Sequence, residues 1–384
     1  MIWKLCAGLI AGLYVSTFSE AAAPDFIHAT YLVGSRIENR DEIERTRFSQ
    51  FNFIYLMASP DWTTEDFNRT DADLPQQLAA QHRFPEGDQG LSLVPALIDR
   101  AHRQGVKVLA SIVATDTPLI ASDATKRRLF AQAMAAFVAK YGFDGLEVDW
   151  ERSLHLDNYM ALMQELRSAL NALPPTRTYY LTTALHTSPH FPAGQLPERQ
   201  FNAAQAAQLC QAVDWINIMT YDMSGGVWGK TASHNTPLNR IQQVVPQRWA
   251  AFPPEKLCIG LASYGFKYTG IKPDQPQTNR LSESGRYCTY TELAPLLAQG
   301  WTERFEPGAE APYYFSPDQA DFITIDNPRS LTAKVQWVLS RHYRGVFWWE
   351  FHCDYLPADG QTNPQHPLVD AVEPLLPPIQ YATP

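Results

Sequence analysis

Residues 143–151 have the sequence Phe-Asp-Gly-Leu-Glu-Val-Asp-Trp-Glu, in which acidic and apolar side chains alternate. Because successive side chains of a β-strand point to opposite faces, Glu147, Asp149 and Glu151 share one face. The other face is entirely apolar and consists of Leu146, Val148 and Trp150. This pattern predicts a buried strand whose apolar face packs on helices and whose acidic face is turned away from them.

Short apolar runs recur along the chain and alternate with segments of helical period. The seven other strand candidates are residues 28–33, 51–57, 107–113, 179–184, 215–219, 256–261 and 345–349, and clear helix candidates are residues 124–140, 156–173 and 330–341. Eight short strands separated by helices predict an α/β fold in which a parallel sheet closes into a (β/α)8 TIM barrel. The alternative is an open doubly wound sheet, but no glycine-rich phosphate-binding turn follows the first strand candidate.

Residues 268–325 interrupt this alternation, since they are irregular and offer only one short helix candidate, at residues 291–299. We expect them to form a small α+β insertion, an inserted subdomain between strands 7 and 8 of the barrel. Functional loops of a TIM barrel gather at the carboxyl ends of its strands, so the insertion should form a wall of the active site. The long loop at residues 59–92 is expected to form another wall, and residues 24–384 to form one catalytic barrel.

The composition of the 384-residue chain suits one large barrel. Hydrophobic residues make up 45% of the chain and charged residues 18%, which allows a sizeable core and argues against disorder. The formal net charge of −9 and the lack of a long basic run argue against nucleic acid as a partner. The 10 Trp, 17 Tyr and 19 Phe favour a neutral substrate with stackable faces, such as a sugar.

The N-terminus has the order of features that is typical of an export signal. Lys4 supplies a positive charge, residues 5–18 supply a short apolar core, and residues 21–23 are three alanines directly before Pro24. We therefore predict a signal peptide at residues 1–23 and a secreted or periplasmic protein. A buried N-terminal helix and an uncleaved anchor are the alternatives, although the apolar run is shorter than the roughly 20 residues that span a bilayer.

Four cysteines remain after removal of residues 1–23, namely Cys210, Cys258, Cys288 and Cys353. An exported protein can pair its cysteines in disulfides, and free buried thiols are the alternative. The spacing of the cysteines does not resemble that of a metal site, and we expect neither a metal nor another cofactor.

The acidic face of residues 143–151 also indicates a kind of chemistry. Three carboxylates on one side of a buried strand repel one another, so at least one should have a raised pKa and keep a proton near neutral pH. A protonated carboxyl group at the carboxyl end of a strand is what general-acid catalysis at a glycosidic oxygen requires. An acidic ladder on a solvated edge strand is the alternative, which the apolar opposite face disfavours.

Residues 144–151 resemble the strand-4 signature of the family 18 chitinases, Asp-Gly-x-Asp-x-Asp-Trp-Glu, with Glu147 in place of the usual Asp. Further motifs resemble the same family in the same order along the chain. They are residues 107–112, residues 219–222 (Met-Thr-Tyr-Asp), Trp228 with residues 234–238, residues 260–265, residues 326–330 and residues 345–350. Val113 and Ala114 stand where the family usually has a glycine pair.

The resemblance implies a mechanism in which the N-acetyl group of the substrate is the nucleophile, an exception to catalysis by two carboxylates. Glu151 would act as general acid and base, and Asp149 would orient the acetamido group. Glu147 would share a proton with Asp149, and Tyr221 would donate a hydrogen bond to the acetyl carbonyl. The substrate-binding residues implied are Trp349 as the floor beneath the sugar, Asp222, Met219, Trp228 and Tyr31. Outside such motifs, tryptophan and methionine side chains are more often core residues.

By this resemblance we expect a retaining chitinase that hydrolyses β-1,4-linked N-acetylglucosamine polymers or oligomers. Its partner would be chitin or a chitooligosaccharide, with no nucleic acid and no membrane after signal cleavage, and the protein would be a monomer. One alternative is an N-acetylglucosaminidase that acts on N-glycan cores or peptidoglycan. Another is a catalytically weak lectin that binds chitooligosaccharides, which the presence of Glu151 disfavours.

Overall fold

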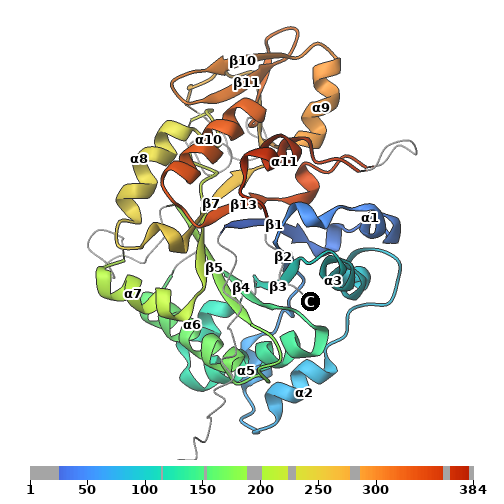
Figure 1. Cartoon of the computed structure of the whole chain (residues 1–384), viewed down its shortest axis with the longest axis vertical. Coiled ribbons are helices and arrows are strands. Elements are labelled where there is room, and N and C mark those ends of the chain that lie inside the picture. The colour runs from blue at the N-terminus through green and yellow to red at the C-terminus, as the bar shows by residue number, and fades with distance from the viewer. Residues whose placement is uncertain are drawn as a thin grey trace, which may run out of the picture.

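Eight parallel strands close into a barrel at the centre of the molecule (Figure 1). The computed structural model describes residues 26–113, 116–150, 154–187, 201–223, 231–276, 286–357 and 364–379. The strands, in barrel order, are β1 (Ile27–Val33), β13 (Gly345–Trp349), β7 (Leu257–Ala262), β6 (Trp215–Met219), β5 (Tyr180–His186), β4 (Gly145–Asp149), β3 (Lys107–Ile112) and β2 (Phe53–Met57). The predicted (β/α)8 barrel is therefore confirmed, and the open sheet is excluded.

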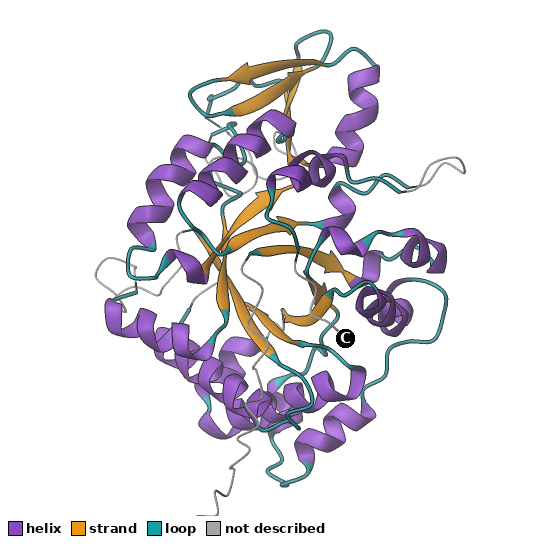
Figure 2. Ribbon diagram, viewed as in Figure 1, coloured by secondary structure: helices purple, strands orange, loops and turns teal. Residues whose placement is uncertain are grey.

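Helices lie around the outside of the barrel (Figure 2). They are α1 (Arg40–Arg45), α2 (Leu74–Gln81), α3 (Val94–Arg103), α4 (Thr117–Ser122), α5 (Ala124–Tyr141), α6 (Leu156–Asn171), α7 (Ala203–Ala212), α8 (Leu238–Arg248), α10 (Pro328–Ser340) and α11 (Pro367–Val372). Local chemistry sets the ends of α5: the Asp123 carboxylate accepts hydrogen bonds from the first free N–H groups, and Gly142 ends the helix at a φ of 78°.

The alternating side chains of the strands form two separate apolar cores. The outer core, between strands and helices, contains Leu146, Val148 and Trp150. The inner core fills the barrel itself, where the Trp215 indole N–H donates to the Tyr55 hydroxyl at 2.8 Å. Because side chains fill the lumen, a substrate must bind at the carboxyl ends of the strands rather than inside the barrel.

A second, antiparallel sheet is built from the chain between β7 and β13. Its strand order is β10 (Thr302–Glu306), β11 (Ala311–Phe315), β12 (Asp321–Thr324), β8 (Tyr264–Thr269) and β9 (Arg286–Thr289), and helix α9 (Tyr290–Ala298) follows β9. The sheet begins at Tyr264 rather than at residue 268, because β8 follows β7 almost without a connection. Its aromatic face, which includes Tyr264 and Phe266, belongs to the same apolar cluster as the barrel interior.

The expectation of one long loop at residues 59–92 is wrong. Helix α2 lies within this region and packs against α5, where the Lys140 ammonium group donates to the Ala79 carbonyl at 3.0 Å. The ring of Phe67 also lies 5.8 Å from that of Phe130 on α5. The helix has only eight residues, too few for a helical period to stand out in the sequence, and tertiary contacts with α5 stabilise it.

The four cysteines within the described ranges are all free thiols, and all but Cys210 are buried. The disulfide alternative is therefore wrong, and the buried thiols act as small apolar side chains. Within the described ranges, no helix has the length and apolar character needed to cross a bilayer.

Candidate active site

Strand β4 places two of the three predicted carboxylates at its carboxyl end. Glu147 is 0% exposed, and its Oε2 atom accepts a hydrogen bond of 2.7 Å from the Ser111 hydroxyl. The parallel pairing of β3 with β4 sets Ser111 opposite Glu147, so the register of the sheet creates this contact. Asp149 follows two residues later, half-buried on the same face of the strand. Glu151, the predicted acid, lies outside the described residues.

Tyr31 of β1 lies beside these carboxylates. Its side chain is 1% exposed, and its hydroxyl has no hydrogen-bond partner in the part of the chain that the structure describes. Burial raises the pKa of Tyr31 well above its usual value, and the nearby charges of Glu147 and Asp149 add to the effect. Tyr31 therefore presents a neutral hydroxyl next to both carboxylates, able to donate to a group that enters the site.

The ring of Tyr221, just after β6, packs against a glycine on the neighbouring strand β7. A Cβ atom at Gly260 would lie 2.9 Å from the Tyr221 ring and 3.0 Å from that of Phe347, which is too close for any other residue. Met219, at the end of β6, and Tyr221 are both buried in the inner cluster. The sequence therefore fixes the position of the Tyr221 ring through the absence of a side chain on β7.

Asp222 is held at the junction between the barrel and the second sheet. It has a left-handed backbone, with a φ of 55°, which aspartate tolerates better than most residues. The Asn235 amide oxygen accepts from the Asp222 N–H at 2.7 Å, and the Tyr264 hydroxyl donates to the Asp222 carboxylate at 2.7 Å. Burial, followed by the adjacent Asp222 charge, raises the pKa of Tyr264 well above its usual value, so its hydroxyl remains a donor.

The two tryptophans at the end of β13 point in opposite directions. Trp348 is buried in the outer core, where its indole N–H donates to the His28 imidazole at 2.9 Å. Trp349 is only half-buried and packs against the inner cluster, with its ring 5.3 Å from that of Tyr31. Of the pair, Trp349 therefore has the exposure and the position of a sugar platform. Trp228, the other predicted tryptophan, lies outside the described residues.

The first acid of the motif, Asp144, has a structural position instead. Its buried carboxylate accepts hydrogen bonds from the Val108 N–H at 2.9 Å and the His102 imidazole at 2.7 Å, and lies 3.3 Å from the Lys107 ammonium group. Burial raises the pKa of Asp144, but these donors and charges outweigh it, so the net shift is downward. Asp144 is thus an ionised carboxylate that joins β4 to β3 and α3.

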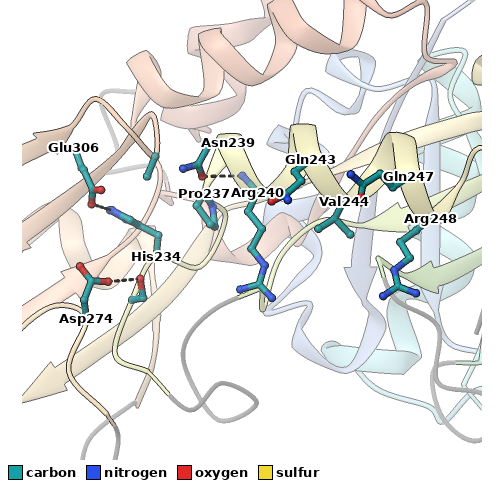
Figure 3. A pocket seen from close by; sticks show the side chains of 12 residues that line it. His234, Pro237, Asn239, Arg240, Gln243, Val244, Gln247, Arg248, Asp274 and Glu306 are labelled. Atoms are coloured by element: carbon teal, nitrogen blue, oxygen red, sulfur yellow. Dashed lines mark hydrogen bonds and ion pairs between the residues drawn. The ribbon is translucent and has the colours of Figure 1, made fainter. Parts of the chain in front are cut away.

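A cavity of about 710 Å³ lies along helix α8, and its lining contains none of the site residues described above (Figure 3). The lining is polar, with Arg240, Gln243 and Arg248 on the helix. At one end the His234 imidazole lies 2.8 Å from the Glu306 carboxylate. Because it lacks the carboxylates of β4 and an aromatic platform, we assign the reaction site to the strand ends of the barrel instead.

Ser111, Asn235, Gly260 and Tyr264 lie within the recognised sequence motifs, but the sequence alone does not indicate their roles. Each acts on a predicted site residue through a contact between distant parts of the chain. The one signal for them in the sequence is that the motifs that contain them occur in the same order as in family 18.

A closed parallel barrel with carboxylates, tyrosines and a half-buried tryptophan at its strand ends fits the class of glycoside hydrolases, whose reaction uses carboxyl groups. The chain belongs to family 18 of this class, since the model for the glycosyl hydrolases family 18 matches residues 60–354. The resemblance seen in the sequence is therefore confirmed.

Similarity to individual proteins agrees with this assignment. The chain is 28% identical over 306 residues to Chitinase A1 of Niallia circulans, a match that covers 67% of this chain but only 42% of that protein. It is 25% identical over 373 residues to Chitinase 1 of Aphanocladium album, covering 90% of this chain and 86% of that protein. The fold matches a GH18 chitinase from Cycas revoluta solved in complex with (GlcNAc)4, with a TM-score of 0.69, 20% identity, and coverage of 91% of this chain and 98% of that chain.

Proposed function

We propose that the protein is a retaining chitinase that hydrolyses β-1,4-linked N-acetylglucosamine polymers or oligomers by substrate-assisted catalysis. The observation that carries the proposal is the pair of carboxylates on the inner face of β4, surrounded by Tyr31, Tyr221 and Trp349. The printed names of the relatives and the (GlcNAc)4 complex of the Cycas revoluta enzyme support the same substrate class.

In the proposed reaction the substrate supplies its own nucleophile. Asp149 accepts a hydrogen bond from the acetamido N–H and turns the acetyl oxygen towards the anomeric carbon. Tyr221 donates a hydrogen bond to that oxygen, so the group is held in an attacking geometry and its motion is restricted before the reaction. Attack forms a bond from the acetyl oxygen to the anomeric carbon, while the glycosidic bond breaks.

Glu151 supplies and then recovers a proton. It protonates the departing glycosidic oxygen in the first step, and in the second it removes a proton from the water that attacks the anomeric carbon. That attack breaks the bond to the acetyl oxygen and restores the N-acetyl group. Two successive displacements at the same carbon retain its configuration.

Glu147 adjusts the charge of Asp149. The two carboxylates lie two positions apart on one face of β4, so they favour sharing one proton over carrying two negative charges. The Ser111 hydroxyl donates to Oε2 of Glu147 and so holds this carboxylate in one orientation. Glu147 is longer than the usual Asp by one methylene, which should displace the pH dependence of the reaction.

The remaining residues bind the sugar. Trp349 provides the floor beneath the sugar at the cleavage site, and Met219 lines the pocket for its acetyl group. Asp222 contacts the sugar, and its clamp by Asn235 and Tyr264 holds it ready for this role. Tyr31 and Trp228 complete the binding surface. We further propose that residues 1–23, which lie outside the described residues, direct export of the enzyme.

Hydrolysis of chitohexaose by the wild type and by Glu151→Gln tests the proposal, with product anomers followed by NMR. We expect β-anomers from the wild type and a loss of at least about a hundredfold in kcat for Glu151→Gln. Glu44→Gln, at an exposed position on α1, is the matched control and should behave as wild type. Binding of chitohexaose without cleavage would instead establish a lectin, and cleavage of N-glycan cores or peptidoglycan alone would establish the other alternative.

A further inference from the structure

Four charged side chains form a row of successive contacts that includes Glu350, the residue after Trp349. Arg36 ends the short helix η1 (Gly34–Arg36), Glu42 is on α1, and Glu350 and His352 come just after β13, with His352 in the short helix η6 (Phe351–Cys353). None of the four has a place in the proposed reaction. Their contacts link the segment that follows Trp349 to helix α1, and Glu42 and His352 are 310 residues apart in the chain.

Glu350 is the central member of this row. It is 0% exposed, and its Oε1 atom accepts a hydrogen bond of 2.7 Å from Arg36. Its Oε2 atom accepts from the His352 N–H at 3.3 Å and lies 3.5 Å from the His352 imidazole Nδ1. Burial raises the pKa of Glu350, but His352 and Arg36 outweigh it and lower the pKa overall, so the carboxylate stays ionised.

His352 lies between two carboxylates. On the other side of its ring, Nε2 is 3.0 Å from Oε1 of Glu42, which is itself buried and accepts from the Glu38 N–H through its second oxygen at 2.7 Å. Burial lowers the pKa of His352, but Glu350 and Glu42 outweigh it and raise the pKa to about 9. At neutral pH the imidazolium therefore bridges the end of β13 to α1.

The row adjoins the platform through the main chain. The Trp349 carbonyl accepts from the Ser263 N–H at 3.0 Å, which fixes one side of the residue to the chain after β7. The next residue along the chain is Glu350, whose side chain is fixed by Arg36 and His352. Three of the four side chains are buried or largely buried, and only that of Arg36, at one end, is exposed. A largely buried chain of charges adds little net stability because desolvation costs about as much as pairing gains, and its best-attested use is to select one geometry.

We propose that Arg36, Glu350, His352 and Glu42 form a positioning network that holds Trp349 at the angle at which it binds the sugar. The proposal rests on the proposed function, because it assigns Trp349 a substrate. Loss of the network should weaken substrate binding, which appears in KM, and leave the carboxylate chemistry on β4 intact, which appears in kcat.

Only His352 in this network changes charge near pH 9. The titratable groups that act on it are Glu350, Glu42, Tyr355 and His366. Arg36 and Cys353 lie against Glu350 instead. Burial raises the pKa of Tyr355 to about 12 and lowers that of His366 to about 3. It also raises the pKa of Cys353 well above its usual value, so none of these three groups changes charge near pH 9. Because the folded pKa of His352 is raised, its bridge is present at neutral pH and is lost as the pH rises through about 9.

The test measures KM and kcat for chitotetraose between pH 6 and pH 10 in the wild type, His352→Gln and Glu42→Gln. We expect the wild-type KM to rise above about pH 9, and His352→Gln to have a KM raised about tenfold at every pH with kcat within about twofold. Glu42→Gln removes one of the two carboxylates that raise the His352 pKa, so its KM should rise at a lower pH than that of the wild type. The control is Asp41→Asn, which removes an exposed ion pair with Arg45 on the same helix and should change nothing.

A merely structural role would give a different result. It would lower the melting temperature of both variants without moving the pH at which KM rises, and that outcome would overturn the proposal, as would equal losses in kcat and KM. If the wild type cleaves no chitooligosaccharide, the proposed function fails separately, and calorimetric titration of chitotetraose against the same variants then decides the inference. Unchanged affinity in His352→Gln, or no binding to the wild type, would overturn it.

Discussion

Gly260→Ala tests whether a missing side chain on β7 sets the position of Tyr221, the residue proposed to bind the acetyl oxygen. A Cβ atom there would lie 2.9 Å from Cε1 of Tyr221, 3.0 Å from Cζ of Phe347 and 3.1 Å from the Ile218 carbonyl oxygen. These distances are about half an ångström shorter than an ordinary carbon contact. The Ile218 carbonyl belongs to the strand backbone and cannot retreat, so the Tyr221 ring must move by about this amount.

Two magnitudes follow from that displacement. Overpacking of a filled core costs about 1–3 kcal/mol of unfolding free energy, which urea titration measures. A misplacement of 1 Å in an active site costs about a hundredfold in rate, so a displacement of about 0.5 Å should lower kcat about tenfold. The assay is the initial rate on a chromogenic chitooligosaccharide at saturating concentration, since the tyrosine hydroxyl acts on the bound substrate.

Gly308→Ala provides the matched control. At Gly308 the nearest atom to a new Cβ is the Glu306 carboxylate at 3.8 Å, so neither stability nor rate should change. A Gly260→Ala variant with reduced stability but wild-type kcat would refute the reasoning, because the position of the Tyr221 ring would then have no effect on the rate.

Three further variants examine the carboxylates and the platform. Glu147→Asp shortens a side chain bound to Ser111, so the pH–rate curve should shift; an unchanged curve would contradict proton sharing on β4. Asp144→Asn should lower the unfolding free energy by about 3 kcal/mol at pH 7. Because the folded pKa of Asp144 is depressed, this difference should vanish as the pH falls below its usual value of 3.8, and a constant difference would refute the ion-pair account. Trp349→Ala should raise KM at least about tenfold with a smaller loss in kcat, and a loss confined to kcat would remove Trp349 from sugar binding.

The barrel was predictable from the sequence because its strands carry a strong local signal. Alternation along residues 145–149 separates Leu146 and Val148 from Glu147 and Asp149, and the structure places the first pair in the outer core and Glu147 beside Ser111. Periodicity needs no knowledge of distant residues, which is why α5 agrees with its predicted range to within one residue at each end, and α6 and α10 agree with theirs to within two.

Contacts between distant segments were not predictable in the same way. The Ser111–Glu147 hydrogen bond depends on the register between β3 and β4, and the clamp on Asp222 depends on where the second sheet meets the barrel. Helix α2 was missed because a helix of only eight residues shows little period and depends on α5 for its stability. Local pattern thus placed Glu147 and Asp149 on one face of β4, while contacts between distant segments determine what holds the predicted site residues.

The Tyr264–Asp222 hydrogen bond has a consequence for any exchange of parts between relatives of this enzyme. Tyr264 is the first residue of the second sheet, and Asn235, which holds both Tyr264 and Asp222, comes from the segment before α8. A chimera that imports the sheet alone would therefore separate a donor from its acceptor. The smallest transferable unit includes both the sheet and the segment of Asn235, and its acceptor on the barrel must be an aspartate at position 222.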